Sequence, residues 1–553
     1  MWLWHKKMSY SVPVSRITFL LASIIVAFEC GANTPCPNTT PQQSDSIKVD
    51  KVVISTQNIF DDSDTEQYLL HRLANQFHIS TKPTVIEERL PFKEGDIVTA
   101  EQLAEAERII RKEVYIRDAS VAFSDTCNID EAVTVEVTTW DNWSMLPTVS
   151  FGRKGGKNKF ELGVKEDNLL GKGIQLSAEY KTDEQRSGYR FKVGSQIPFI
   201  PYSSMLIDVE DNDDGSIIQF DAAKPFYQLS SENAWFINYL DFDKEDEIFQ
   251  NGASQRIFGH TGNQLILAYG MLLANTDNQY HRLTLGYTQQ EDQFYNVEHN
   301  EFTALDTLPQ DRKFSYPWVE YEYLQADFQV LQDIYLTNQQ EDINLGWHHT
   351  FKLGVETNPF ANANYGLHAQ WRWQKGYMWP TTLLMFSGQV NKTYHVQDHD
   401  LLYANLTAEA FYRFASKFGI YNLTQVTISS NNYADLPIAL GGESGVRGYP
   451  LQYQHGDHRA INAFELRYYP KWNLYRMFDI GLAAFADVGK AWQNNTSNPN
   501  EYTGTLASTG IGARIYSNRS SHKHVIHLDI ATPLTGGPNT DSWQWQLQVK
   551  QSF

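Results

Sequence analysis

The residues best suited to a chemical task in this 553-residue chain are one arginine and two carboxylates. Arg447 lies in the segment Gly441–Pro450 (GGESGVRGYP), whose four glycines permit the backbone to fold back tightly. Glu465 and Asp487 follow, each on the polar side of a segment that alternates apolar and polar residues. A guanidinium is a planar fork of donors that fits carboxylates. If the loop folds inward, we expect Arg447 to pair with Glu465 and Asp487.

Motifs of common enzyme sites are missing from the sequence. It contains no Gly-x-Ser-x-Gly nucleophile elbow, no His-Glu-x-x-His zinc motif and no phosphate-binding loop. The segment His395–Asp400 has metal-ligand residue types, but a solvated polar turn is the commoner setting for such a run. Asp211–Gly215 resembles part of a calcium loop without a terminal Glu in register, so we interpret it as a hairpin turn. We expect no catalytic residue, no metal and no cofactor.

Long alternating segments must position Arg447 and the two carboxylates. Period-two alternation dominates from Pro147 onward, for example in Ile174–Tyr180 and Tyr365–Trp373, and its apolar side is rich in Trp and Tyr. Short turns and long acidic loops such as Asp241–Arg256 alternate as connections. A soluble sandwich also alternates, but the aromatic apolar side and the loop pattern favour a transmembrane antiparallel β-barrel over residues 145–553. At roughly 25 residues per strand and connection, the 407 residues from Pro147 give about 16 strands.

The chain ends in an amphipathic segment. Its apolar side contains Trp543 and the four residues that we assign to a C-terminal sorting strand for the outer membrane, namely Trp545, Leu547, Val549 and Phe553. Glutamines and a lysine occupy the intervening positions. Alternation up to an aromatic C-terminus is what such a sorting signal requires.

The first residues have the layout of a secretory signal peptide. Basic residues precede an apolar run of twelve residues, Ile17–Phe28, which is shorter than the ~20 residues of a membrane-spanning helix. We expect a signal peptide over residues 1–32 and a linker over residues 33–46, with lipid attachment at Cys30 as the alternative to cleavage after Ala32. Cys36 and Cys127 then remain, either as a disulfide in an oxidising compartment or as two free thiols.

Residues 47–140 have a different pattern, that of a small α+β domain. A strand around Val52–Ile54 precedes a helix with Leu69, Leu73 and Phe77 at helical spacing. A second helix begins at Thr99 with a capping box to Gln102, and the strands Ala119–Ser124 and Val133–Val137 follow. Such a unit has strand edges that can accept a peptide as an added strand.

Taken in order, these motifs resemble those of the BamA/TamA-type superfamily of outer-membrane barrels, also called the bacterial surface antigen family. The segment Val446-Arg447-Gly448-Tyr449 matches the tip of the family's sixth extracellular loop, and Phe485, Asp487 and Gly489 match its Phe-x-Asp-x-Gly strand motif. Weaker likenesses to an early hairpin, to the Glu-Leu-Arg strand, to the last strands and to one polypeptide-transport-associated (POTRA) domain lie at Asn168–Gly173, Glu465–Arg467, Gly510–Gly512, Leu528–Leu534, Phe92–Asp96 and Tyr115–Ala119.

The resemblance implies a barrel of about 16 strands in the outer membrane of a Gram-negative bacterium, with one POTRA-like domain in the periplasm. It implies that the loop docks inside through Arg447, Glu465 and Asp487, and that a weak seam separates the first and last strands. Insertion or translocation of proteins through that seam or the lumen would follow, and a passive pore or lipid conduit with the same fold is the alternative.

The partners that the resemblance implies are outer-membrane lipid, an unfolded polypeptide or β-barrel client, and a periplasmic protein at the POTRA-like domain; a homodimer also fits. A single POTRA-like domain, where better-known members have several, indicates a small relative and not the general assembly machine. The net charge of −20 argues against nucleic acid as a partner.

Overall fold

A computed structural model of the chain describes residues 46–60, 68–127, 133–297, 308–337, 339–357, 365–398, 400–442, 444–493, 500–519 and 525–550. The expected signal peptide, residues 33–45 of the expected linker, Cys36 and Phe553 lie outside this set, and so does the side chain of Cys127. Among the described residues, no helix has the length and apolar composition needed to span a bilayer.

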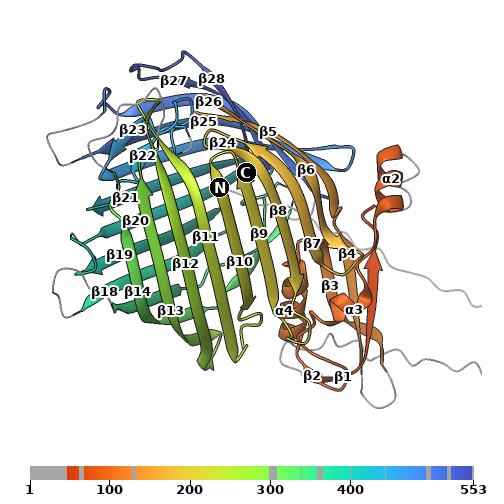
Figure 1. Ribbon diagram of the computed structural model, residues 1–553. Coiled ribbons are helices and arrows are strands. Elements are labelled where there is room, and N and C mark those ends of the chain that lie inside the picture. Colours follow the sequence, from red (N-terminus) through yellow and green to blue (C-terminus); the bar gives the residue numbers. More distant parts are fainter. Residues whose placement is uncertain are drawn as a thin grey trace, which may run out of the picture.

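Antiparallel strands close into one barrel of 20 strands, so the prediction of about 16 is wrong (Figure 1). From the first strand onward, these are β5 (Met145–Lys154), β6 (Lys157–Leu169), β7 (Ile174–Thr182), β8 (Ser187–Gln196), β9 (Ser204–Asn212), β10 (Gly215–Lys224), β11 (Asn233–Gln250), β12 (Ala253–Thr276), β13 (Gln279–Tyr295), β14 (Arg312–Gln325), β17 (His348–Glu356), β18 (Gly366–Trp379), β19 (Thr382–Tyr394), β20 (Leu402–Ala415), β21 (Phe418–Ser430), β24 (His458–Leu474), β25 (Phe478–Trp492), β26 (Leu506–Ser517), β27 (Val525–Pro533) and β28 (Gln544–Lys550).

The higher strand count has a simple cause in the turns. Turns of only two residues connect neighbouring strands at both ends of the barrel, for example Gly155–Gly156 between β5 and β6 and Asp277–Asn278 between β12 and β13. The segment interpreted as a hairpin turn also contains such a connection, Asp213–Asp214 between β9 and β10. An allowance of roughly 25 residues per strand and connection is too large for such hairpins, in which the ladder continues almost to the turn.

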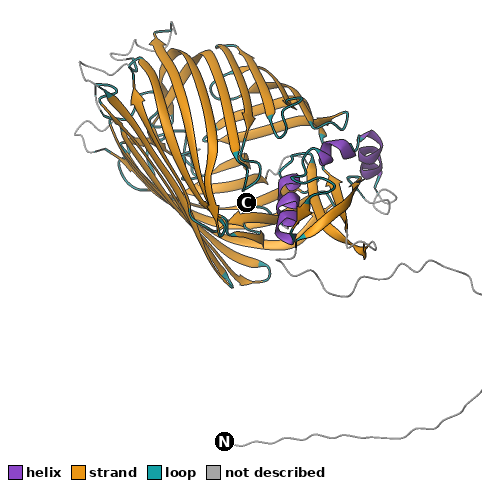
Figure 2. Ribbon diagram, turned by 90° about the horizontal axis from the view of Figure 1, so that it is seen from below, coloured by secondary structure: helices purple, strands orange, loops and turns teal. Residues whose placement is uncertain are grey.

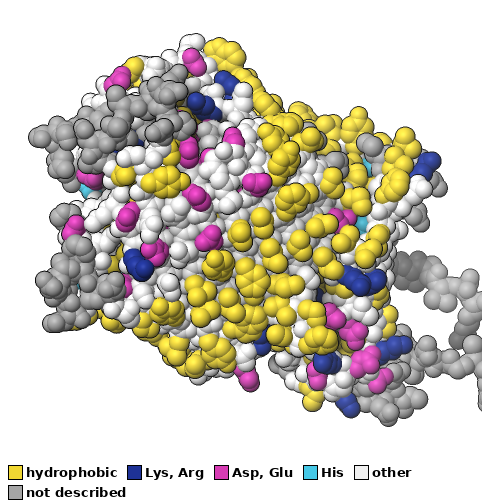
Figure 3. All heavy atoms as spheres, in the orientation of Figure 1, with side chains coloured by type: hydrophobic (Ala, Val, Ile, Leu, Met, Phe, Trp, Pro, Cys, Tyr) yellow, Lys and Arg dark blue, Asp and Glu magenta, His cyan; other side chains and the backbone are white. Residues whose placement is uncertain are grey.

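Alternation divides the barrel wall into an apolar outer side and a polar inner side. On β17, Phe351, Leu353 and Val355 are each between 45% and 49% exposed and project outward, whereas the carboxylates of β24 and β25 project inward and are buried. Figure 3 shows apolar side chains covering the part of the face where β9 to β12 lie in Figure 1. Exposed apolar surface on this scale needs a non-aqueous neighbour.

A small α+β unit precedes the barrel. Its sheet has the order β2-β1-β4-β3 with β1 and β4 parallel, and its helices lie together at one end of the barrel (Figure 2). Helix α4 begins after Thr99 with the capping box that the sequence predicts. The elements are β1 (Ile47–Gln57), α2 (Leu69–Phe77), α3 (Pro83–Glu87), β2 (Ile97–Val98), α4 (Ala100–Arg111), β3 (Ile116–Cys127) and β4 (Val133–Asp141).

Candidate functional site

The glycine-rich loop between β21 and β24 folds back onto the inner wall of the barrel. Its short hairpin of β22 (Ile438–Leu440) and β23 (Gln454–Gly456) brackets the tip. Gly445 and Gly448 have φ values of +136° and +87°, which side chains rarely adopt. A Cβ on Gly448 would lie 3.1 Å from the Cβ of Ala531 on β27, so the glycine lets the tip approach the wall.

Arg447 lies between the two carboxylates that the sequence assigns to it. Its Nε and Nη2 donate to the two oxygens of Asp487, both at 2.7 Å, and its Nη1 donates to Glu465 at 2.8 Å. The guanidinium also stacks on Phe485, with 3.5 Å between its carbon and the ring centroid. The Asp487 side chain is fully buried and that of Arg447 is 8% exposed. This two-pronged geometry suits arginine and would be lost with lysine.

Three further charges complete the cluster, and the sequence reasoning missed them as members. Arg467 donates to Glu465 at 3.0 Å, and Arg514 bridges Glu465 and Asp529. Asp529 lies 3.6 Å from Arg447. The cluster therefore has three arginines and three carboxylates. The sequence places all three on the polar side of alternating segments, so they could have been considered. Which polar side chains of neighbouring strands come into contact, however, depends on strand register.

The other predicted loop and strand residues pack around this cluster. Val446 and Tyr449 are fully buried, and the Tyr449 hydroxyl lies 2.7 Å from the carbonyl oxygen of Thr535. A Cβ on Gly489 would lie 2.9 Å from the Val446 side chain, so this glycine makes room for the loop. The loop tip is therefore held by apolar packing as well as by charge.

A second ion pair ties the same loop to the far wall. Arg312 on β14 binds Asp435, which lies before β22, through two hydrogen bonds of 2.6 and 2.9 Å. Arg312 is also within 3.3 Å of Asp292 and lies over the ring of Tyr433. The loop thus spans the lumen from β14 to β25, an attachment that no motif in the sequence indicates.

A second insertion enters the lumen from the end next to the α+β unit. We call residues 326–347 the lumenal hairpin; it contains β15 (Phe328–Gln332) and β16 (Gln340–Asn344). Its Ile343 and Leu345 pack on inward-facing side chains of the wall, Leu383, Met385 and Phe411. The sequence reasoning made no separate prediction for this stretch and included it in the alternating β region.

The lumenal hairpin connects the α+β unit to the charge cluster. Asp342 lies 3.3 Å from Arg111 of α4, and Phe328 lies under the guanidinium of Arg108 at 4.7 Å. On its other side, the carbonyl oxygen of Ile334 accepts a hydrogen bond of 3.2 Å from Arg467. A continuous chain of contacts therefore runs from α4 to Arg447.

The barrel closes between its first and last strands through a short contact. Among the described residues, strands β28 and β5 share one registered pair, Leu547 with Arg153. By comparison, β5 and β6 pair along their whole length, from Met145↔Glu166 to Lys154↔Lys157. Trp545 stacks on Phe151 across the junction, with 6.0 Å between ring centroids. In the part of the chain that the structure describes, this junction, which we call the seam, is paired over much less of its length than β5 and β6 are.

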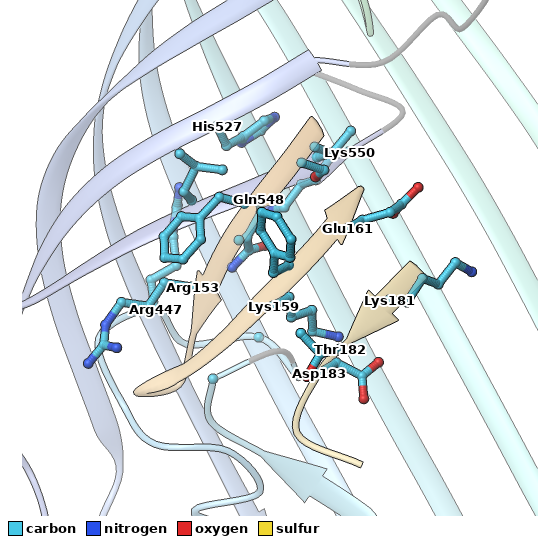
Figure 4. A pocket seen from close by; sticks show the side chains of 18 of the residues that line it. Arg153, Lys159, Glu161, Lys181, Thr182, Asp183, Arg447, His527, Gln548 and Lys550 are labelled. Atoms are coloured by element: carbon cyan, nitrogen blue, oxygen red, sulfur yellow. The ribbon is translucent and has the colours of Figure 1, made fainter. Parts of the chain in front are cut away.

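A cavity of about 520 Å³ lies behind the seam (Figure 4). Strands β5 to β7 form one side, β28 the other, and the tip of the loop with Arg447 borders it. The lining side chains that Figure 4 labels are polar or charged. Several of them are basic, among them Arg153, Lys159, Lys181 and Lys550. The arrangement leaves room beside the weakly paired edges of β5 and β28.

Nothing in the described part of the chain forms a group of three or more His, Cys, Asp or Glu side chains suited to a metal ion. The predicted sorting-strand residues Trp545, Leu547 and Val549 lie on the outer side of β28, where Val549 is 47% exposed.

Comparison with known proteins gives similarity of structure without similarity of sequence. No protein-family model and no curated protein matches the chain. Among solved structures, CdiB from Escherichia coli has 10% identity and a TM-score of 0.47 over 94% of this chain and 93% of its own. CdiB from Acinetobacter baumannii has 12% identity and a TM-score of 0.45 over 91% and 74%. BamA from Haemophilus ducreyi lacking POTRA domains 1–3 has 12% identity and a TM-score of 0.41 over 91% and 84%.

Proposed function

We propose that this protein is an outer-membrane barrel of the BamA/TamA type that inserts or translocates polypeptides. The seam is the observation that carries the proposal, because its two strands pair over far less of their described length than neighbouring strands of the wall do. Unpaired strand edges are templates for new strands, and in lipid each unpaired backbone group costs free energy. A client strand at β5 or β28 would supply the missing hydrogen bonds.

The docked loop fits the same role. Arg447 joins the loop to β24 and β25, close to the strands that end at the seam. The loop also borders the cavity behind the seam. We propose that docking of the loop sets the position of β24 to β28 and thereby how readily the seam opens.

The α+β unit is proposed to be a single POTRA domain on the periplasmic side. Its edge strand β3 offers backbone groups to an incoming peptide. A client chain or an accessory periplasmic protein is the partner that this edge would bind. The role is non-enzymatic, since strand pairing needs no catalytic group.

A passive pore or lipid conduit is the second candidate, and the width of a 20-stranded barrel favours it. Two insertions occupy the lumen, however, which restricts steady passage. The two functions differ in what they do to a client.

The test uses the full chain in liposomes and a small unfolded outer-membrane barrel as client. Faster folding of the client than in empty liposomes, read by its gel-mobility shift, is expected. Unchanged client folding together with steady ion conductance would instead assign the protein to the pore class.

A further inference from the structure

Helix α2 presents an apolar face that remains exposed among the residues that the structure describes. Leu69, Leu73 and Phe77, which the sequence places at helical spacing, are 66%, 37% and 66% exposed. The opposite side of the helix is buried, with His71 and Ala74 almost inaccessible. The periodicity therefore predicts the helix correctly, but its large apolar residues do not form the core of the unit.

The buried side of α2 fixes the helix to the barrel. The His71 ring nitrogen Nε2 lies 2.6 Å from the carbonyl oxygen of Tyr475, in the turn between β24 and β25. Ala74 shares an apolar cluster with Phe60 and Met477, the latter in the same turn. Tyr68, just before the helix, contacts the Tyr475 ring edge-on at 6.1 Å between centroids. The exposed face is thus held at a defined place beside the end of β24.

The outer side of β24 leads directly to this helix. Phe464 and Leu466 on its outer side are 40% and 39% exposed, and Trp472 and Leu474 nearer the turn are 52% and 51% exposed. Tyr475 in the turn is 59% exposed. Figure 3 shows apolar side chains continuing to the right-hand edge, where α2 lies in Figure 1. Aromatic side chains at the end of a lipid-facing strand are typical of the membrane–water interface.

We propose that α2 is an interfacial helix whose face of Leu69, Leu73 and Phe77 lies in the periplasmic leaflet of the outer membrane. The inference rests on the proposed membrane location of the barrel and adds a lipid contact for the α+β unit. Continuity with the outer side of β24 identifies lipid as the occupant, because the same surface would otherwise end abruptly in water. A nine-residue helix is about 14 Å long, which suits a helix lying along the interface and not across it.

Such a contact would fix the orientation of the α+β unit relative to the membrane. The lipid contact of α2 would add to the contacts that join the unit to the barrel, among them His71 with Tyr475 and α4 with the lumenal hairpin. Tilting of the unit away from the membrane would require α2 to leave the lipid.

The test measures depth in the bilayer at single cysteines. Cys30, Cys36 and Cys127 are replaced by Ser, and Leu73→Cys is labelled with an environment-sensitive fluorophore in phosphatidylcholine and phosphatidylglycerol vesicles. The matched control is Arg72→Cys, one residue away and about 100° around the same helix. We expect quenching by a nitroxide-bearing lipid to be at least about threefold stronger at position 73, and quenching by aqueous iodide to be correspondingly weaker.

Leu353→Cys on the outer side of β17 separates the two hypotheses. If the lipid quenches the label at position 353 but not at position 73, the interfacial-helix proposal is wrong and the membrane location of the barrel stands. If it quenches neither label, the proposed membrane location of the barrel is wrong as well. The unsubstituted chain provides a second readout, in which a photoactivatable phospholipid is expected to label the peptide that contains residues 69–77. Labelling confined to barrel peptides contradicts the proposal.

Discussion

Arg447 is held by more than a single ion pair. With Arg447 included, the cluster has three positive and three negative charges, and each of the three arginines contacts at least one of the three carboxylates. Removing one member of a buried pair leaves its partner desolvated and uncompensated, which costs more than the pair itself contributes. The position of the loop should therefore be sensitive to any single substitution in the cluster.

Arg447→Ala is expected to destabilise the docked loop by about 3–5 kcal/mol, because Asp487 remains buried without its two-pronged partner. Arg447→Lys should restore only part of the loss, since an ammonium cannot bind both Asp487 and Glu465 in the same geometry. Limited proteolysis of the loop in detergent or liposomes measures the effect.

Arg372→Ala is the matched control, because Arg372 is half exposed and pairs with Glu320 at 3.4 Å. An exposed pair contributes at most about 1 kcal/mol. Equal protease resistance of the Arg447 and Arg372 variants would contradict the docking role.

Gly489→Ala tests the apolar part of the docking. An added methyl group would lie 2.9 Å from Val446 and 3.2 Å from Leu440, so one side must move. We expect a loss of about 1–3 kcal/mol in loop docking, typical of overpacking. Gly156→Ala is unsuitable as a control because its φ is +83°, whereas Gly419→Ala on β21, where the added Cβ would lie 3.4 Å from the carbonyl oxygen of Tyr412, meets a milder contact. Increased proteolysis in both glycine variants alike would argue against a specific fit.

The sequence allowed Arg447, Glu465 and Asp487 to be selected, because residue type, alternation and a family motif agree on them. Arg514 and Asp529 were not selected, because their meeting depends on details of the wall. Asp529 lies opposite Gly512 in the barrel wall. A Cβ added to Gly512 would lie 1.8 Å from a carboxylate oxygen of Asp529. The sequence analysis recognised the motif that contains Gly512, but it did not select Asp529, whose carboxylate occupies the space beside that glycine.

The lumenal hairpin is the element whose position was least expected. It joins α4 to β24 through Asp342 on one side and Ile334 on the other. We expect the Asp342→Asn substitution to weaken the contact with Arg111 and to increase motion of the α+β unit. The distance distribution between spin labels on α4 and on a wall strand should broaden, whereas an unchanged distribution would show that the ion pair does not fix the unit.

The turn of the lumenal hairpin is built around one buried carboxylate. Glu341 accepts hydrogen bonds of 3.1–3.2 Å from the backbone N–H groups of Ile334, Tyr335 and Leu336. Burial raises the pKa of Glu341 to about 7 in spite of these donors, and the charge of Asp333 adds to the effect. Its pKa in the folded state thus exceeds the unfolded value of about 4.3.

The hairpin should therefore be more stable at low pH. The stabilising proton is retained below the unfolded pKa, and its contribution is lost as pH rises from about 4.3 to about 7. Amide hydrogen exchange of residues 328–344, corrected for intrinsic rates, is expected to be slower at pH 5.5 than at pH 8. The Glu341→Gln substitution should remove the difference, and a pH dependence that survives it would assign the effect to another group.

At the scale of the whole molecule, alternation identifies the barrel but not its size. The outer apolar side and the inner polar side follow from period two, which is why the β region could be recognised from Ile174–Tyr180 or Tyr365–Trp373. The number of strands depends on turn length, and two-residue turns such as Gly155–Gly156 leave room for 20 strands. The lumenal hairpin could not be distinguished from a surface loop, because its partners are distant in sequence, whereas the inward fold of the glycine-rich loop was expected from its motif.

The seam is the central claim, and locking it is the most direct test. Arg153 and Leu547 are directly paired across it, and such partners lie at Cα distances suited to a disulfide. In a chain with its native cysteines replaced by Ser, the double substitution Arg153→Cys and Leu547→Cys would join β5 to β28. The control joins Phe351 to Trp371, a registered pair within the continuous wall.

The measurement is the folding rate of an unfolded outer-membrane barrel in liposomes that contain each variant, before and after reduction. We predict that the oxidised seam variant fails to accelerate folding, that reduction restores acceleration, and that the wall control is active in both states. Equal acceleration by the locked and reduced seam would contradict insertion through the seam.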